Sequence, residues 1–233
     1  MELVGAPANE LNGLLTASFE EWARGHHGSG VAGSGSCAIS GGATAMIFLS
    51  AMRAANVDWQ RITLFWADER AVPADDPDSN YGLADRMLLA PLGAKAPRAI
   101  RMPADASSLG QAALWYDKAL ATELKGGPLD LAILGIGEDG HICSLFPGHR
   151  ALLVEDLRAV AIEDSPKPPA RRLSLTLRYV LQTKKIWVIA IGSRKLPVLR
   201  AALNQTSHTT PLDLLMRQAK DVTVFTDQII HRR

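Results

Sequence analysis

The residues best suited to chemistry lie in the stretch Leu129–Gly148, LDLAILGIGEDGHICSLFPG. Its first half is a short apolar run after Gly-Gly-Pro, which predicts a buried strand in an α/β sheet. Directly after this run, three glycines free the backbone of side chains, and Asp139 and His141 place an acid and a base in the same turn. We expect the glycines to bend a loop that points Asp139 and His141 into a cleft at the carboxyl end of the strand.

The same glycines, Gly135, Gly137 and Gly140, also satisfy the G-x-G-x-x-G fingerprint of dinucleotide-binding proteins. That fingerprint requires a helix directly after its third glycine. Here Pro147 arrives within about two turns, too early for a helix of roughly 11 residues. The two acidic residues that precede the third glycine would also face a pyrophosphate with negative charge. We therefore reject the dinucleotide interpretation.

A second glycine turn, Gly41-Gly42-Ala43-Thr44, separates a predicted strand over residues 36–40 from a predicted helix over 45–55. The N-terminus of a helix offers free backbone N–H groups and the positive end of its dipole, and missing side chains let an anion approach them. A tight turn that glycine merely permits would have the same sequence. By itself the turn is therefore only a weak indication of phosphate binding.

Two further predicted strands end in charged residues. Ile62–Ala67 runs into Asp68-Glu69-Arg70, and Lys184–Ile191 runs into Gly192-Ser193-Arg194-Lys195. An isolated Asp-Glu-Arg is ordinarily a solvated turn with an ion pair. Its position after a buried strand favours a site, and Lys195 has the length to reach an anion.

The segment Ser165–Leu177, SPKPPARRLSLTL, is unusual for a connection. Its three prolines stiffen the backbone and leave few amide donors, so that Lys167, Arg171 and Arg172 are presented from a constrained chain. Such a segment is either an ordinary surface linker or one wall of an anion site.

Helices and strands alternate along the whole chain. Helices are predicted over residues 9–24, 45–55, from 80, over 106–125, after 195 and over 209–218, and strands over 36–40, 62–67, 98–102, 129–134, 157–162, 184–191 and 222–225. This alternation predicts an α/β fold, a doubly wound, mainly parallel sheet with helices on both faces (Rossmann-like), in a single domain over 1–233. Ligands of such folds bind beyond the carboxyl ends of the strands. We expect the four strand ends described above to form one cleft with an anion end and an acid–base end.

Composition limits the partners. A formal net charge of +1 suggests neither a nucleic-acid binder nor a protein of the membrane surface.

The cysteines and the apolar runs indicate the compartment. Cys37 and Cys143 form no disulfide framework and no metal-ligand spacing. Neither a leader peptide nor an apolar run of roughly 20 residues is evident. Adjacent His26 and His27 end the first predicted helix, where the helix dipole favours them without a metal. We expect a cytoplasmic protein.

Several segments together resemble the 6-phosphogluconolactonase family, within the wider superfamily of glucosamine-6-phosphate isomerases and lactonases. They are GIGEDGHICSLFPG, SGGAT, WADER with the downstream DPDSNYGL, SPKPPARRLSLTL and GSRK, in order from Ser40 to Lys195. The segments GIGEDGHICSLFPG and SPKPPARRLSLTL are specific to the family, whereas SGG and GxxK alone are not. The resemblance implies hydrolysis of 6-phospho-D-glucono-1,5-lactone to 6-phosphogluconate in the oxidative pentose phosphate pathway. It also implies a monomer whose partner is a small phosphosugar lactone, with no metal and no organic cofactor.

Hydrolysis of a lactone requires a base for water, stabilisation of an oxyanion and a proton for the leaving ring oxygen. Under the resemblance, His141 is the base, because an imidazole is partly neutral at pH 7 and can return the proton. Asp139 or Asp68 would orient or support it.

The phosphate is assigned to the Gly41-Gly42-Ala43-Thr44 turn, with Arg70, Arg172 and Lys195 as cationic partners. The family pattern has its arginine at Arg172 and not at the residue before it. Which cation meets the phosphate and which meets the oxyanion stays open. The resemblance also suggests Asn80 as a sugar contact.

The chain departs from the family pattern at two places. Ala43 and Ala45 replace a hydroxyl and a proline in the glycine turn, so that Thr44 would supply the hydroxyl. The family loop usually continues GHTAS or similar, whereas Ile142 and Cys143 follow His141 here. We expect Cys143 to be a small buried thiol rather than a nucleophile.

Two other functions compete with lactone hydrolysis. Sugar-phosphate deaminases or isomerases share a Gly-Asp-Gly-His loop, but in them it leads into an AFNEP-like segment with a glutamate, where this chain has SLFPG. A non-catalytic sugar-phosphate sensor would keep the phosphate end but would not need the base His141 beside Asp139.

Overall fold

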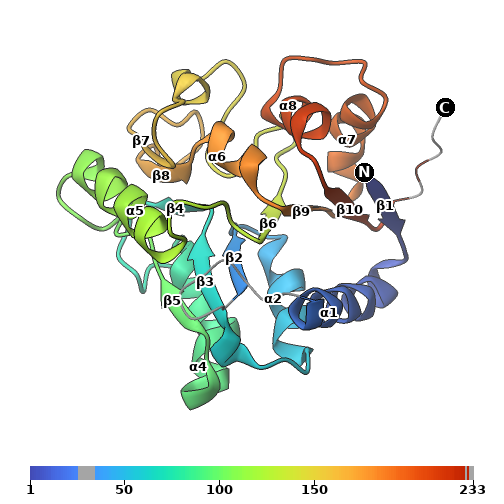
Figure 1. The fold of residues 1–233 in the computed structure, drawn as a ribbon. Helices are drawn as coiled ribbons and strands as arrows, with labels where there is room; N and C mark the ends of the chain where they lie inside the picture. The colour runs from blue at the N-terminus through green and yellow to red at the C-terminus, as the bar shows by residue number, and fades with distance from the viewer. Residues whose placement is uncertain (26–34, 229, 231–233) are drawn as a thin grey trace.

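A seven-stranded parallel sheet forms the centre of the computed structural model, which describes residues 1–25, 35–228 and 230 (Figure 1). His26 and His27 lie outside these residues. In sheet order the strands are β1 (Glu2–Gly5), β10 (Val222–Thr226), β9 (Lys185–Ala190), β6 (Leu131–Gly135), β2 (Gly35–Ile39), β3 (Ile62–Trp66) and β5 (Arg98–Ile100). The predicted parallel sheet is confirmed, and β1 is an edge strand that the sequence analysis did not predict.

The strand order reverses direction between β2 and β6. From β2 the chain builds outward through β3 to β5, and from its neighbour β6 it builds the other way through β9 to β10. This reversal is the switch point at which doubly wound sheets open a crevice for ligands. The four strands with glycine or charge at their ends, β9, β6, β2 and β3, are therefore adjacent.

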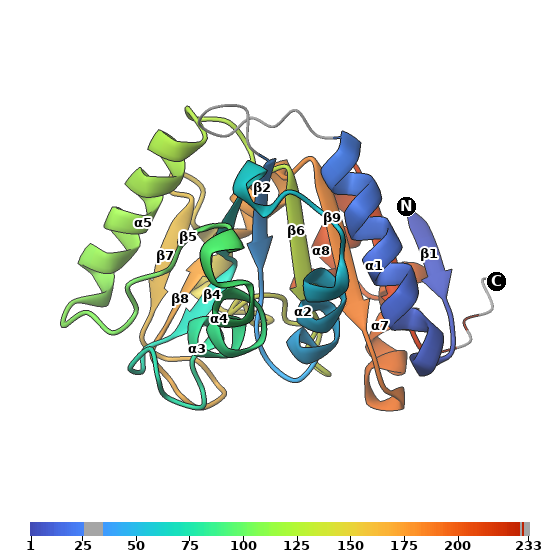
Figure 2. The ribbon, with the colours of Figure 1, turned by 90° about the horizontal axis from the view of Figure 1, so that it is seen from below.

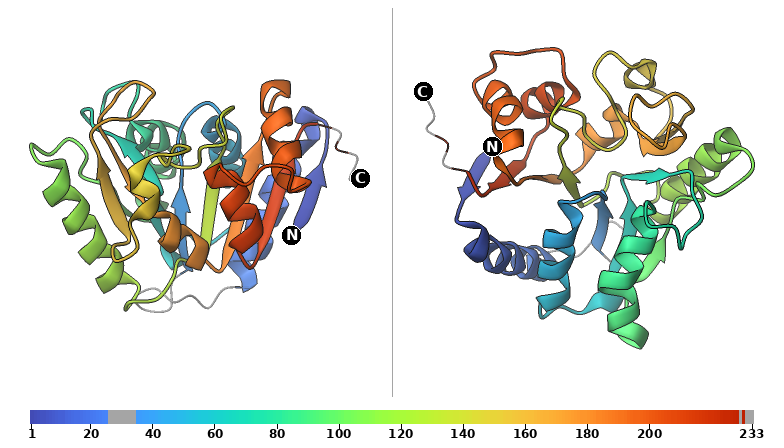
Figure 3. Two further views of the ribbon diagram at one scale, coloured as in Figure 1. Left: turned by 90° about the horizontal axis from the view of Figure 1, so that it is seen from above. Right: turned by 180° about the vertical axis from the view of Figure 1, so that it is seen from behind.

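Helices cover both faces of the sheet. In Figure 1, α1 and α2 lie on one side, whereas α7 and α8 lie on the other, and the views from below and above agree (Figures 2 and 3). The helices are α1 (Ala8–Gly25), α2 (Ala45–Ala54), α3 (Asn80–Ala84), α5 (Leu109–Glu123), α6 (Leu177–Gln182), α7 (Leu196–Leu203) and α8 (Pro211–Gln218); a π turn, Asp85–Leu89, leads from α3 into α4 (Ala90–Leu92). Among the described residues, no helix has both the length and the apolar character needed to cross a lipid bilayer.

The helical period of the apolar residues explains the packing of α1. Leu11, Leu15, Phe19 and Trp22 are buried on one side of the helix, as residues spaced by three and four positions must be. The Phe19 ring lies 6.5 Å from that of Trp187 on β9, edge to face. Burial of each large apolar side chain contributes about 1.5–3 kcal/mol, so this row attaches α1 to the sheet.

A second, three-stranded antiparallel sheet was not predicted. It consists of β4 (Asp68–Arg70), β8 (Arg172–Leu175) and β7 (Ala159–Ile162), in that order. The Asp-Glu-Arg stretch is therefore a strand rather than a turn, and part of the proline-rich connection pairs with it. This pairing joins segments about 100 residues apart, for which a local pattern carries no signal.

Candidate active site

A cleft opens at the carboxyl ends of the four central strands. It is lined by Ser40, Gly41, Gly42, Ala43, Thr44, Asp68, Arg70, Gly135, Ile136, Gly137, His141, Cys143, Arg172 and Lys195. Every predicted site residue is in this set except two: Asp139, which contacts His141, and Asn80, which contacts Asp68. The structure thus brings the predicted residues together at the switch point of the sheet.

The acid and base of the loop after β6 form a hydrogen-bonded pair. His141 Nδ1 lies 2.6 Å from Asp139 Oδ1. Because a carboxylate only accepts, this contact assigns the proton to Nδ1 and leaves Nε2 as the basic nitrogen. His141 lines the cleft, so a base is part of the cleft wall.

Burial and charge act in opposite directions on this pair. Burial lowers the pKa of His141, and although Asp139 opposes this shift, the pKa stays below its ordinary value. For Asp139, burial alone would raise the pKa, but hydrogen bonds from His141 and Lys167 outweigh it and lower the pKa. At neutral pH the pair is therefore a neutral imidazole beside a carboxylate.

Glycine is required where the loop turns. A Cβ on Gly137 would lie 2.0 Å from His141 Nδ1. The backbone N–H of Gly137 donates to the His141 carbonyl at 2.9 Å. Gly140 has a φ of +81°, and a Cβ there would lie 2.7 Å from Thr210. The first glycine makes room for the imidazole, and the second lets the loop approach the N-terminus of α8.

The SLFPG segment contributes Phe146, which the sequence analysis did not single out. Its ring centroid lies 4.6 Å from that of His141, and the Arg172 guanidinium lies 5.7 Å from the same ring. The aromatic ring therefore limits the orientations of the imidazole and accounts for part of its burial.

Asp68 is held by two neighbours, one at its carboxylate and one at its backbone carbonyl. Its Oδ2 accepts from Ser144 Oγ at 2.8 Å, and its carbonyl accepts from Asn80 Nδ2, also at 2.8 Å. A Cβ on Gly41 would lie 1.7 Å from Asn80 Oδ1. Asn80 is buried against Asp68 and the glycine turn, and its contact with the sugar stays a prediction.

Strand β4 separates its charges by face. Asp68 and Arg70 line the cleft, whereas Glu69 between them is turned away and accepts from the backbone N–H groups of Asn80 and Tyr81, each at 2.7 Å. Alternation along a strand produces this division. Burial raises the pKa of Glu69 despite these bonds, and its role is to hold the start of α3.

Two arginines are neighbours on adjacent strands of the small sheet. Arg70 is the register partner of Arg172. Arg172 is 4% exposed and donates to the carbonyls of Lys167, Pro168 and Pro169 at 2.8 to 3.1 Å. Burial lowers its pKa. Arg70 donates to the Asp78 carbonyl at 2.8 Å, and its buried Nε has no partner among the described residues.

The glycine turn and the last strand end meet at the start of α2. Lys195 Nζ donates to Thr44 Oγ1 at 2.6 Å, and burial lowers the pKa of the lysine. Gly42 adopts a φ of +79°. Among the described residues, none accepts a hydrogen bond from the backbone N–H groups of Gly42, Ala43 or Thr44. An ammonium and free N–H groups thus converge here, as an anion requires.

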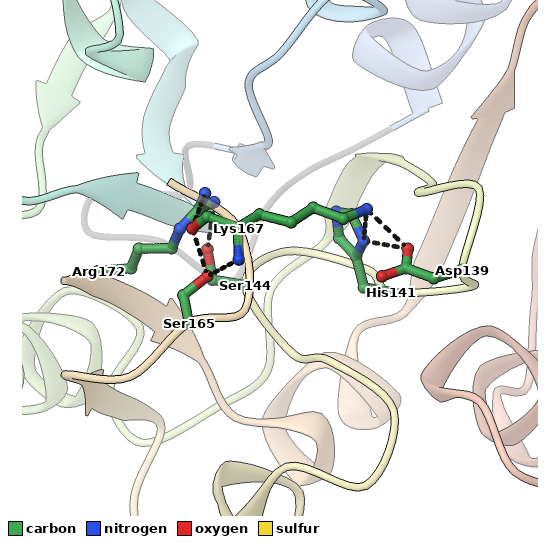
Figure 4. Close-up of polar contacts among 6 residues, drawn as sticks. All are labelled: Asp139, His141, Ser144, Ser165, Lys167 and Arg172. Carbon is green, nitrogen blue, oxygen red and sulfur yellow. Dashed lines mark hydrogen bonds and ion pairs between the residues drawn. The ribbon is translucent and has the colours of Figure 1, made fainter. Parts of the chain in front are cut away.

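Lys167 is a site residue that the sequence indicated only as part of a stiff basic segment. Its Nζ lies 3.0 Å from Asp139 Oδ1 and 3.4 Å from His141 Nδ1 (Figure 4). Lysine between prolines was the available signal, but nothing local tells which carboxylate it reaches.

Neither cysteine chemistry nor a metal cluster is evident in the part of the chain that the structure describes. Burial raises the pKa of the Cys143 thiol well above its ordinary value, which suppresses the nucleophilic thiolate. No group of three or more His, Cys, Asp or Glu side chains is arranged to hold a metal ion there.

Comparison with known proteins agrees with this geometry. The family of glucosamine-6-phosphate isomerases/6-phosphogluconolactonase matches residues 14–225. A 6-phosphogluconolactonase of Mycobacterium tuberculosis is 34% identical over 202 residues, 82% of each chain. A solved 6-phosphogluconolactonase of Trypanosoma brucei superposes with a TM-score of 0.80 at 26% identity, covering 96% of this chain and 94% of that one. A solved monomeric glucosamine-6-phosphate deaminase, 18% identical over 97% of each chain, shares the fold with a TM-score of 0.78. The chain therefore belongs to the glucosamine-6-phosphate isomerase/6-phosphogluconolactonase family.

Proposed function

We propose that this protein hydrolyses 6-phospho-D-glucono-1,5-lactone to 6-phospho-D-gluconate, a step of the oxidative pentose phosphate pathway. The observation that carries the proposal is the His141–Asp139 pair, whose histidine lines a cleft that also contains three cations. The similarity to 6-phosphogluconolactonases over most of the chain supports the choice of substrate.

His141 acts as the general base in this proposal. Its Nε2 takes a proton from water while the water oxygen bonds to the lactone carbonyl carbon, and Asp139 stabilises the imidazolium that forms. The carbonyl electrons move onto oxygen as a tetrahedral oxyanion, which a cleft cation stabilises. When the bond to the ring oxygen breaks, the imidazolium returns its proton to that oxygen, so that the histidine ends neutral.

The phosphate is best accommodated at the start of α2. Lys195 uses one contact on Thr44 and keeps further N–H donors, and the N–H groups of the glycine turn face the same region. Arg172 uses most of its donors on backbone carbonyls, whereas among the described residues the Arg70 guanidinium donates to a single carbonyl, that of Asp78. Arg70 therefore keeps more donors for a ligand. We propose Lys195 and the turn as the phosphate site, with Arg70 and Arg172 flanking Asp68.

The loop after the base favours hydrolysis over isomerisation. Residues 142–148 contain no carboxylate, and Ser144 and Phe146 use the positions after His141 to hold Asp68 and to pack against the imidazole. An isomerase needs a further acid–base group for ring opening and proton transfer, which this loop lacks.

A coupled assay tests the proposal. Freshly generated 6-phosphogluconolactone is followed to 6-phosphogluconate above its spontaneous hydrolysis, for wild type and His141→Ala. We expect an enhancement in wild type that falls by about 100-fold or more in the variant. If wild type gives no enhancement but releases ammonia from glucosamine 6-phosphate, the deaminase function replaces this one; if neither substrate turns over while both bind, the protein is a sensor.

We further propose that residues 1–233 act as one cytoplasmic lactonase domain, monomeric and without metal or organic cofactor. Sedimentation at micromolar concentration and assay after chelation test the last two points. A dimer, or activity restored only by an added metal ion, would contradict them.

A further inference from the structure

One side chain of the proline-rich segment, that of Lys167, contacts the acid–base pair. Lys167 extends from this segment to Asp139, where its Nζ and His141 Nδ1 share the same oxygen, Oδ1 (Figure 4). Their distances to that oxygen are 3.0 and 2.6 Å. The carboxylate therefore receives two donors from two different segments of the chain.

The backbone at Lys167 is fixed from both sides. Its N–H donates to Ser165 Oγ at 3.2 Å, and its carbonyl accepts from Ser165 Oγ at 2.9 Å and from Arg172 Nη2 at 3.1 Å. The proline on each side of it restricts the chain further. A lysine on such a backbone loses less conformational freedom on pairing than one on a free loop.

An ordinary surface ion pair is the alternative interpretation. The side chains of Lys167 and Asp139 are 44% and 36% exposed, and exposed pairs contribute little to stability. The shared oxygen makes this pair different, because whatever orients Asp139 also orients the imidazole, which is only 19% exposed. The effect of Lys167 should therefore appear in the chemistry of His141 rather than in the stability of the fold.

We propose that Lys167 is a positioning residue for the hydrolysis proposed above, on which this inference rests. It holds the Asp139 carboxylate against His141 Nδ1 and offsets the carboxylate charge, so that Nε2 stays unprotonated and ready to accept a proton from water.

The charges around His141 set the direction of the expected effect. Asp139 on the same loop and Asp68 on β4 favour the imidazolium, whereas Lys167 opposes it; the cations Arg70, Arg172 and Lys195 also line the cleft. When Lys167 is removed, the charge of Asp139 is no longer offset, and the pKa of His141 rises. Less of the free base is then present near neutral pH.

Three variants separate this role from a general effect of charge. In Lys167→Met the acid limb of the pH profile of kcat/KM should move upward by about half a pH unit or more. Lost positioning should lower kcat at the pH optimum about tenfold, with KM changed less than twofold. Lys167→Arg should restore the acid limb. Arg171→Met is the matched control, because Arg171 lies on the same segment but pairs with the exposed Glu163; its profile should equal that of wild type.

Titration of the His141 imidazole by NMR provides a readout that needs no turnover. The midpoint should rise in Lys167→Met and not in Arg171→Met, even if the protein proves to act on another substrate. Unchanged midpoints and an unchanged pH profile would overturn the proposal. An increase in KM with an unmoved acid limb would overturn it too, since Lys167 would then bind substrate directly.

Discussion

Lys195 Nζ lies 2.6 Å from Thr44 Oγ1, although 151 positions separate the two residues in the chain. The contact joins the end of β9 to the start of α2 across the switch point of the sheet. It places an ammonium beside the backbone N–H groups of the glycine turn and beside the Thr44 hydroxyl.

Substitution of Lys195 should separate phosphate binding from chemistry. Lys195→Ala should raise KM for the phosphorylated lactone about tenfold or more, because a partly buried charge-assisted contact is lost. Turnover of unphosphorylated gluconolactone should stay within about twofold. Arg194→Ala is the control, since Arg194 is exposed and pairs with Glu138. Equal losses on both lactones would contradict the phosphate assignment.

Removal of the charge on Asp139 should move the pH profile opposite to the effect of Lys167→Met. The acid limb of wild type should lie below pH of about 6.5, the ordinary value for histidine, because burial lowers the pKa of His141. Asp139→Asn removes a charge that raises this pKa, so the limb should move to still lower pH. The rate at the optimum should fall on the order of 100-fold, since the tautomer is no longer held. Rate measurements from pH 5 to 8 test both points, and an upward movement would contradict the assignment.

Arg172 should stabilise the fold in addition to contributing charge to the cleft. Arg172→Ala removes the donor of the Pro168 and Pro169 carbonyls, whereas the Lys167 carbonyl keeps Ser165 Oγ. Unpaired buried polar groups cost about 1–3 kcal/mol. We expect the free energy of unfolding in urea to fall by that amount. Arg171→Ala, next to it on the surface, should change the free energy by less than about 0.5 kcal/mol. Equal effects of the two would show that the carbonyl contacts contribute nothing.

Gly137 should be indispensable for activity. In Gly137→Ala the new methyl group would lie 2.0 Å from His141 Nδ1, so that the imidazole must leave its place and kcat should fall by about 100-fold. Gly110→Ala is the comparison, because a Cβ there meets nothing within 4 Å and Gly110 lies in α5. That change should leave kcat unaltered and raise stability by about 0.5–1 kcal/mol. Full activity of Gly137→Ala, measured in the same lactone assay, would exclude the close approach at this loop.

Much of the architecture could be predicted because its signals are local. Apolar runs and helical spacing indicate the parallel strands and the longer helices, and a glycine or a charge directly after a strand indicates the edge that binds ligand. The cleft contains His141, Asp68 and Lys195 for this reason. Short elements such as β1 and α6 escaped, since four to six residues carry too little periodicity to be distinguished from a loop.

Pairings between distant segments were decided by the tertiary structure alone. The sequence could indicate that Lys167 and Arg172 belong to a stiff basic segment, but not that the first reaches Asp139 and the second turns back on its own backbone. Likewise the sequence could not indicate that Asn80 donates to the backbone carbonyl of Asp68. Strand ends are determined by neighbours in the chain, whereas the partner of a long polar side chain depends on which segments folding brings within about 3 Å, and no local pattern encodes that.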